Sequence, residues 1–208
     1  MRAATPAVLI VGTLAVGAPS LAAQQDTLRA APAAASLPPA GFGTLRQDDV
    51  AVRLETATLQ IRLLPLHEGV IRLLAQDTYA SLHRLRETRD SDIARVGRRY
   101  GLSEPTVFIV TFFGRQDRAR FEPELLTITS QNRFFRPVEI LPLSPLWNRR
   151  QLNQRETATA LYIYQDGIRI LDPFEVKYEG VASTDWERSL RTLDRERALV
   201  LARAARKR

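Results

Sequence analysis

The run of eight residues from Thr106 to Phe113 is the feature that most limits how this chain can fold. Its order is Thr-Val-Phe-Ile-Val-Thr-Phe-Phe, so every residue is β-branched or aromatic. Such side chains pack well on a pleated surface, whereas in a helix they lose rotamer freedom. We therefore predict a central β-strand here, within a β-rich domain.

Shorter strands are predicted on both sides of this run. Apolar and polar residues alternate over 50–54 and again, with the opposite parity, over 59–63. The change of parity near Ala57 indicates either a bulge or two consecutive strands. Later segments of the same character predict strands over 125–129, 134–141, 158–165, 168–171 and 174–178.

Proline and glycine refine this arrangement. Pro137 and Pro142 lack an N–H donor, which predicts an edge strand, and Asp166-Gly167 has the composition of a two-residue hairpin turn. The pattern predicts a mainly β (α+β) domain built as an antiparallel β-sandwich. An immunoglobulin-like sandwich is one option, on architecture alone, because the Cys…Trp…Cys pattern is absent.

A helical insertion is predicted near 77–100. Asp77 is a suitable N-cap, and Gly101 follows Tyr100 as a terminator. The polar middle of the segment leaves open a division into two helices, with Asp90 or Ser91 as the second cap.

A C-terminal helix is predicted over 184–205. Thr184 and Glu187 have the spacing of a capping box. One face carries large apolar groups, including Trp186 and Leu193, and we expect its first turns to pack on the β-domain while the arginine-rich end extends into water.

The N-terminus has the layout of a secretory signal peptide over 1–22. Arg2 precedes an apolar stretch of twelve residues, 7–18, and small residues follow it. Twelve residues are too few to span a bilayer, which needs about 20. We expect cleavage after Ala22 or Ala23, with an uncleaved anchor as the alternative, and export to the periplasm or the extracellular space.

The absence of cysteine excludes two classes of exported protein, lipoproteins and disulfide-stabilised domains. A lipoprotein needs a cysteine as its first mature residue, and disulfides need pairs of them, so the sequence excludes both. No second long apolar run is present, so no transmembrane span is expected after cleavage.

Composition divides the rest of the chain into three parts. Residues 23–49 are rich in Ala and Pro and are predicted to be a disordered linker. Residues 50–182 form the globular domain, and 183–208 form the helix with its basic tail. The formal net charge is +7, but Arg2 contributes one charge and the segment from Arg195 onward a net five, so residues 24–194 carry about +1. We therefore expect no nucleic-acid partner and, at most, weak contact of the basic tail with anionic surfaces.

No catalytic, cofactor-binding or metal-binding residue is predicted. The two histidines, His67 and His83, lack any spacing that places partners on one face. An acid–base pair is one reading of His67-Glu68, but a solvated turn is favoured over it, and His83 is most simply an exposed helical residue. Serine-nucleophile and phosphate-loop motifs are absent.

Paired carboxylates and a loop tryptophan are the remaining candidates. Glu122 and Glu124 flank Pro123 and could form the two catalytic carboxylates of a glycosidase. The alternative, which we favour, is that both form surface ion pairs. Trp147 with Arg149 and Arg150 is the best candidate for partner contact, against the alternative that Trp147 caps the core.

These observations favour an exported, non-enzymatic domain that binds or scaffolds an unknown protein or another envelope component. The alternative is an exported carboxylate-based, glycosidase-like hydrolase whose site forms only in three dimensions.

Overall fold

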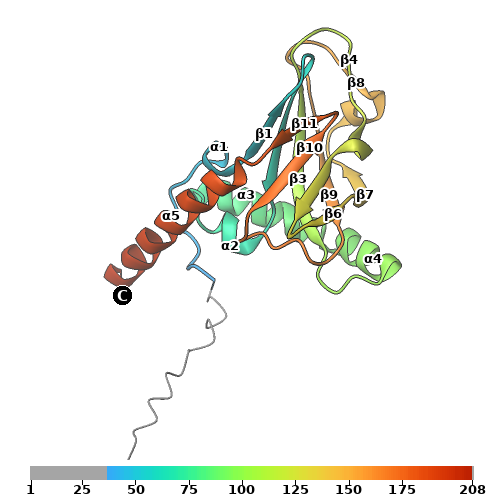
Figure 1. Cartoon of the computed structure of the whole chain (residues 1–208). Coiled ribbons are helices and arrows are strands. Elements are labelled where there is room, and N and C mark those ends of the chain that lie inside the picture. The colour runs from blue at the N-terminus through green and yellow to red at the C-terminus, as the bar shows by residue number, and fades with distance from the viewer. Residues whose placement is uncertain (1–36, 208) are drawn as a thin grey trace, which may run out of the picture. The chain divides into compact units, whose positions relative to one another are not determined.

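The computed structural model describes residues 37–207. The predicted signal peptide and residues 23–36 of the predicted linker lie outside this range. The described chain forms three antiparallel sheets and five α-helices (Figure 1). No helix in this part of the chain is long and apolar enough to cross a bilayer.

The largest sheet has five strands, in the order β1-β2-β3-β9-β7. Their bounds are Val52–Glu55 for β1, Leu59–Pro65 for β2, Thr106–Gly114 for β3, Thr157–Tyr164 for β9 and Pro137–Pro142 for β7. Strand β3 is central, since it pairs with β2 on one side and β9 on the other. Strand β7, which contains Pro137 and Pro142, lies at the edge of the sheet. The predictions of a central strand at 106–113 and of a proline-marked edge strand are both confirmed.

The second sheet has four strands, in the order β11-β10-β5-β6, and lies in front of the first in Figure 1. Its bounds are Val181–Ser183 for β11, Phe174–Tyr178 for β10, Thr127–Ser130 for β5 and Arg133–Phe135 for β6. A small third sheet pairs β4 (Ala119–Arg120) with β8 (Gln151–Leu152). The 3-10 helices η1 (Pro123–Leu125) and η2 (Pro145–Arg149) complete this part.

Aromatic side chains join the two larger sheets. Phe108 of β3 meets Phe174 of β10 edge to face at 5.8 Å between ring centroids, and Phe112 meets Tyr178 at 5.6 Å. The buried hydroxyl of Tyr162 donates to the carbonyl oxygen of Pro123 at 3.1 Å. Burial raises the pKa of the Tyr162 phenol above its ordinary value, so the hydroxyl stays protonated and able to donate.

The mainly β, antiparallel, α+β fold is therefore confirmed, and its two facing sheets are sandwich-like. Three strands that follow one another along the chain, β1, β2 and β3, lie side by side in one sheet. An immunoglobulin domain distributes its strands differently, so the comparison holds for architecture only.

The helical insertion consists of α2 (Glu68–Ile71), α3 (Gln76–Thr88) and α4 (Asp90–Tyr100). The division left open by the sequence is present, with Arg89 between α3 and α4. Gly101 ends α4 with a φ of 66°, the left-handed conformation expected of a terminating glycine. In Figure 1, α3 passes behind the lower part of the molecule and α4 extends to the lower right, past the end of the five-stranded sheet. Helix α5 (Trp186–Arg206) is the predicted C-terminal helix.

Four local predictions are wrong. Residues 168–171 form no strand, and the turn at Asp166-Gly167 makes no hairpin, because β9 and β10 belong to different sheets. The predicted strand 134–141 is divided between β6 and β7, again in different sheets. Helix α5 begins after Asp185, which makes no side-chain capping bond, so Thr184 and Glu187 form no capping box. In the first three cases the chain crosses between sheets, which the local pattern does not reveal. At α5 the N-cap is Asp185, one residue after the position that the capping box requires.

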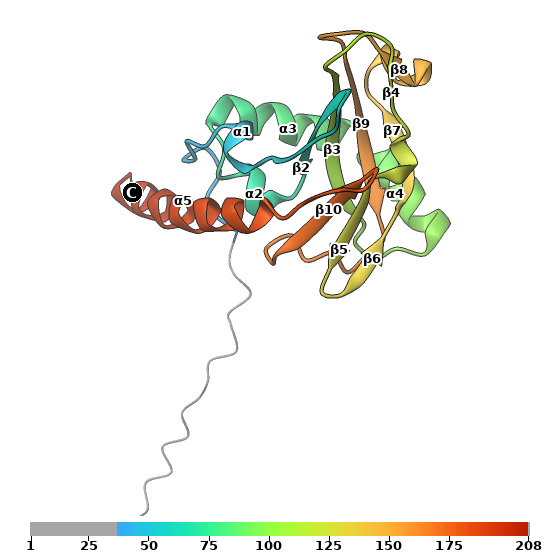
Figure 2. The same cartoon turned by 45° about the horizontal axis from the view of Figure 1, so that its top comes forward.

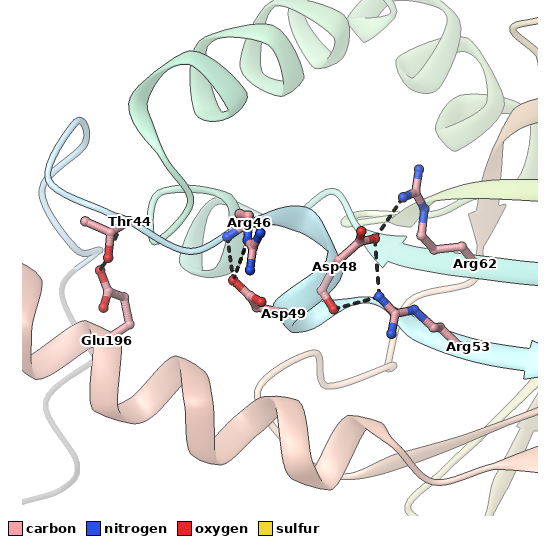
Figure 3. Close-up of polar contacts among 7 residues, drawn as sticks. All are labelled: Thr44, Arg46, Asp48, Asp49, Arg53, Arg62 and Glu196. Carbon is pink, nitrogen blue, oxygen red and sulfur yellow. Dashed lines mark hydrogen bonds and ion pairs between the residues drawn. The ribbon is translucent and has the colours of Figure 1, made fainter.

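The end of the predicted linker is also corrected. Residues 37–49 pack on the domain: Gly43 and Leu45 form parallel bridges with Ala75 and Leu74, and α1 (Gln47–Val50) follows. Asp48 forms ion pairs with Arg53 and Arg62 on the first two strands, as Figure 3 shows. Backbone bridges and ion pairs order this segment. The prediction of disorder was wrong here because it considered only the small number of large apolar residues.

Glu196 on α5 fastens the same segment to the C-terminal helix (Figure 3). Its side chain is buried and accepts hydrogen bonds from the amide and hydroxyl of Thr44, both at 2.9 Å, and from Arg203 at 2.7 Å. Burial raises the pKa of Glu196, but the hydrogen bonds from Arg203 and Thr44 and the charge of Arg203 bring it below the ordinary value of 4.5. The carboxylate is therefore ionised and satisfied.

We expect the Glu196→Gln variant to be less stable than the wild type by about 1–3 kcal/mol at pH 7, because charged hydrogen bonds are lost at a buried site. Urea denaturation measures the difference. Since the folded-state pKa lies below 4.5, the contribution is present above that pH and is lost as the pH falls through the folded-state pKa. The difference should shrink at pH 3.

The control is Asp194→Asn, which removes the same charge from the exposed side of the same helix. An equal loss of stability in both variants would show that Glu196 acts only through net charge.

Candidate functional site

His67 stands between β2 and α2 and is the N-cap of α2. Its Nδ1 accepts a hydrogen bond from the amide of Gly69 at 3.1 Å, so in the neutral ring the hydrogen is on Nε2. Burial lowers the pKa of His67 below 6.5, and the positive charge of Arg86 lowers it further. At neutral pH the ring is therefore uncharged and offers an Nε2–H donor.

A cavity of about 430 Å³ opens beside this ring. Its lining combines apolar side chains with polar and charged ones. The apolar part of the lining includes Pro105, Val107, Ile168 and Ile170, and the polar part includes His67, Arg86 and Glu104. The volume is within the range of small-molecule sites, about 300–1,000 Å³.

Arg86 reaches the cavity from α3. Its Nη1 donates to the carbonyl oxygen of Leu66 at 2.5 Å, which holds the guanidinium against the end of β2. A guanidinium has five N–H donors, so most remain free for another acceptor. Arg197 of α5 adds a repulsive charge at His67, and its Nε is buried without a partner within 37–207. Of these groups, Arg86 and His67 line the cavity and bring N–H donors to it.

The acidic side chains of the cavity differ in how far they are engaged. Asp166 accepts from the amides of Ser103 and Glu104 at 2.7 and 3.1 Å, which makes it a structural residue. Asp172 accepts from Gln131 at 3.0 Å. Glu104 is exposed, and its carboxylate has no hydrogen bond or ion pair among the described residues. Glu104 is therefore the acidic group that is free to meet a ligand.

A neighbouring cluster contains the other histidine. His83 Nδ1 lies 2.9 Å from Glu68 Oε1, and Arg72 Nε donates to Glu68 Oε2 at 2.5 Å. His83 Nε2 is 3.4 Å from a carboxylate oxygen of Glu87, and its ring stacks on Tyr79. A second cavity, of about 480 Å³, is lined by this cluster and shares Arg86 with the first.

The cluster satisfies its own charges. Burial raises the pKa of Glu68, but the hydrogen bonds and charges of Arg72 and His83 lower it below 4.5. Within 37–207 no group of three or more His, Cys, Asp or Glu is arranged to hold a metal. The acid–base pairing weighed for His67 with Glu68 is therefore wrong, since Glu68 bonds to His83, and His67 bonds to a backbone amide.

Trp147 is buried, with an exposed fraction of 2%. Its indole contacts the rings of Phe112, Phe121 and Tyr162 at centroid distances of 5.3 to 6.0 Å. The sequence left open whether Trp147 lies at the surface or caps the core. The structure shows it in the core, because η2 turns the side chain inward. The indole is not available to a partner.

The arginines beside Trp147 lie at the surface and are engaged in ion pairs. Arg149 is 3.4 Å from Glu156, and Arg150 donates to both oxygens of Glu124 at 3.0 and 3.2 Å. Contact of Arg149 and Arg150 with a partner stays a prediction.

Two observations on the carboxylates of residues 37–207 count against the glycosidase comparison. The surface alternative for Glu124 is the one observed, since it pairs with Arg150. The carboxyl groups with shifted pKa values are all shifted downward; they are Asp48, Glu68, Glu124, Glu156 and Glu196. A glycosidase needs one carboxyl group that stays protonated, and these shifts favour the opposite state.

Comparison with known proteins adds no family: no protein-family model, curated protein or solved structure matches this chain. The cavity was missed from sequence because its walls come from distant segments. The 4-residue spacing of His83 and Glu87 was visible in the sequence, but nothing local connects Arg86 with His67 or Ile168.

We expect His67 to make stability fall as the solution is acidified below neutrality. The unfolded histidine takes up a proton near pH 6.5 and the folded one only at lower pH, so between these values unfolding binds a proton. Stability then falls by at most about 1.4 kcal/mol for each pH unit. Urea denaturation at pH 7.5 and 5.5 measures the fall, which should be smaller in His67→Asn.

Asparagine is chosen because its side-chain oxygen can still accept the hydrogen bond from Gly69. An unchanged fall between the two pH values in His67→Asn would contradict the assignment.

Proposed function

We propose that this protein is an exported, non-enzymatic binding domain whose cavity beside His67 takes a small zwitterion with an apolar body, such as a short apolar peptide. The observation that carries the proposal is the meeting of free donors, a free carboxylate and an apolar wall at one cavity. Ligand sites commonly combine an apolar lining with a few converging polar groups.

The donors of the cavity suit a carboxylate. Arg86 supplies N–H groups in a planar fork, which matches the geometry of a carboxylate, and the neutral ring of His67 adds one more donor. Leu66 holds Arg86 in place through its carbonyl oxygen, so little ordering is required when the ligand binds.

The opposite charge of the ligand would meet Glu104, since Asp166 and Asp172 already have protein partners. Ile168 and Ile170 are buried wall residues that exclude water from the body of the ligand. A ligand with only one charge would leave either Arg86 or Glu104 without a counterpart.

Binding is favoured over hydrolysis by the state of the titratable groups. The shifted carboxyl groups favour the ionised form, and the Glu68–His83 pair is closed on itself by Arg72 and Glu87. The alternative of a carboxylate hydrolase has no comparable support.

Calorimetric titration with the dipeptide Leu-Leu and its blocked forms tests the proposal. We expect Arg86→Gln to weaken binding of the free dipeptide about tenfold or more, the equivalent of one charged hydrogen bond. The same variant should leave the affinity for the C-terminal amide unchanged. Glu104→Gln should weaken the free dipeptide in the same way but not its N-acetyl form.

The matched controls are Arg84→Gln and Asp77→Asn on exposed positions of α3, which should bind as the wild type does. Equal affinity for the free and doubly blocked dipeptide would overturn the zwitterion. Binding of all forms that survives filling the cavity with Ile168→Trp would overturn the cavity as the site.

Export is part of the proposal and has its own measurement. Mass spectrometry of the protein recovered from the producing cells should find a mature N-terminus at Ala23 or Gln24, following the small residues that end the predicted signal. A chain that retains Met1 in the cytoplasm would contradict export.

A further inference from the structure

We propose that the exposed face of α5 binds the surface of an anionic lipid bilayer. Residues 188, 191, 195, 199, 202 and 206 recur every three or four positions, so they form one line along the helix. All six are exposed. We call Arg188, Arg191, Arg195 and Arg206 on this line the arginine ridge.

The opposite face of α5 holds the helix to the domain. Its buried residues are Trp186, Ser189, Leu193, Glu196 and Val200. The indole of Trp186 stacks on Phe174 and donates to the carbonyl oxygen of Ile170 at 2.9 Å. The ridge is therefore held outward by the packing of the helix.

Most of the ridge has no counter-charge within the described chain. Arg188 is 3.1 Å from Asp185, whereas Arg191, Arg195 and Arg206 form no ion pair within 37–207. Arg203, which is off this line, is instead bound to Glu196 and to the carbonyl oxygen of Phe42. Within 37–207 the chain therefore pairs Arg203 with a carboxylate and leaves Arg191, Arg195 and Arg206, which face outward, available to another partner.

An exposed leucine on the same line favours a bilayer over a nucleic acid. Leu199 lies on the line of the ridge and is 46% exposed, and Leu201, which is 50% exposed, lies about a third of a turn away from that line. A helix with a basic face and adjoining apolar side chains is typical of interfacial binding, in which arginines meet phosphates and leucines enter the headgroup region. The C-terminal half of α5 also extends beyond the sheets in Figures 1 and 2, so a flat surface can reach it.

This surface differs from the basic tail read from the sequence. It begins at Arg188, before the tail, and it depends on which arginines face outward. It does not rest on the cavity or on the ligand proposed for it.

Co-sedimentation of the exported protein with vesicles tests the proposal. One set is phosphatidylcholine with phosphatidylglycerol, and the other is phosphatidylcholine alone. We expect binding to the anionic set only, weakened about tenfold to thirtyfold in Arg191→Gln/Arg195→Gln, from roughly fivefold for each charge. Leu199→Ser should retain binding at low salt and lose it at high salt.

The matched control is Arg84→Gln/Arg98→Gln, which removes two exposed helical arginines on α3 and α4 and changes the net charge equally. Wild-type-like binding of this control supports the ridge. Equal weakening of both double variants would overturn it, because net charge alone would then explain binding. Ridge-dependent binding to duplex DNA without binding to anionic vesicles would overturn the bilayer as the partner.

Discussion

The packing of β3 against the second sheet is the interaction on which the rest of the molecule depends. Phe108 and Phe112 of β3 contact the rings of Phe174 and Tyr178 on β10. The central strand of the five-stranded sheet therefore also contributes side chains to the core between the two sheets. The hydroxyl of Tyr164 reaches the carbonyl oxygen of Leu126 at 3.2 Å and fixes the chain that enters β5. The aromatic pairs bury apolar surface between the two sheets, and the hydrogen bonds of the tyrosine hydroxyls fix where the contacted segments lie.

The candidate cavity follows from where this core ends. The amide of Leu66 donates to the carbonyl oxygen of Val107 at 2.8 Å, which joins the end of β2 to the start of β3. From β9 the chain then crosses to β10 in the other sheet, and this crossing brings Ile168 and Ile170 into the lining of the same cavity as His67. His67 and Ile168 are 101 residues apart in the sequence.

Helix α5 has two faces with different tasks. Its inner face closes the fold, since Trp186 packs on Phe174 and Glu196 binds Thr44 at the start of the described chain. Its outer face carries arginines that the domain does not neutralise. A buried carboxylate with three hydrogen bonds is stable only where every partner is present. The contacts of Glu196 therefore fix the orientation of α5 about its own axis, and this orientation decides which residues face the solvent.

The sequence by itself determined the elements whose signal is local. β-Branched and aromatic residues specify β3, prolines place β7 at an edge, Gly101 ends α4, and apolar spacing specifies α5. These signals act between neighbours a few residues apart, where backbone preference and periodicity are enough.

Only the tertiary structure decided which distant groups meet. Glu68 bonds to His83 rather than to the adjacent histidine, Trp147 enters the core, and Thr44 finds Glu196 across a separation of 152 residues. The physical reason is that these contacts depend on how helices and sheets pack across long separations, and the chain passes between the two larger sheets from β3 to β5, from β6 to β7 and from β9 to β10. Such a crossing is set by how whole layers pack, and the local pattern is nearly the same whichever layer the next strand joins.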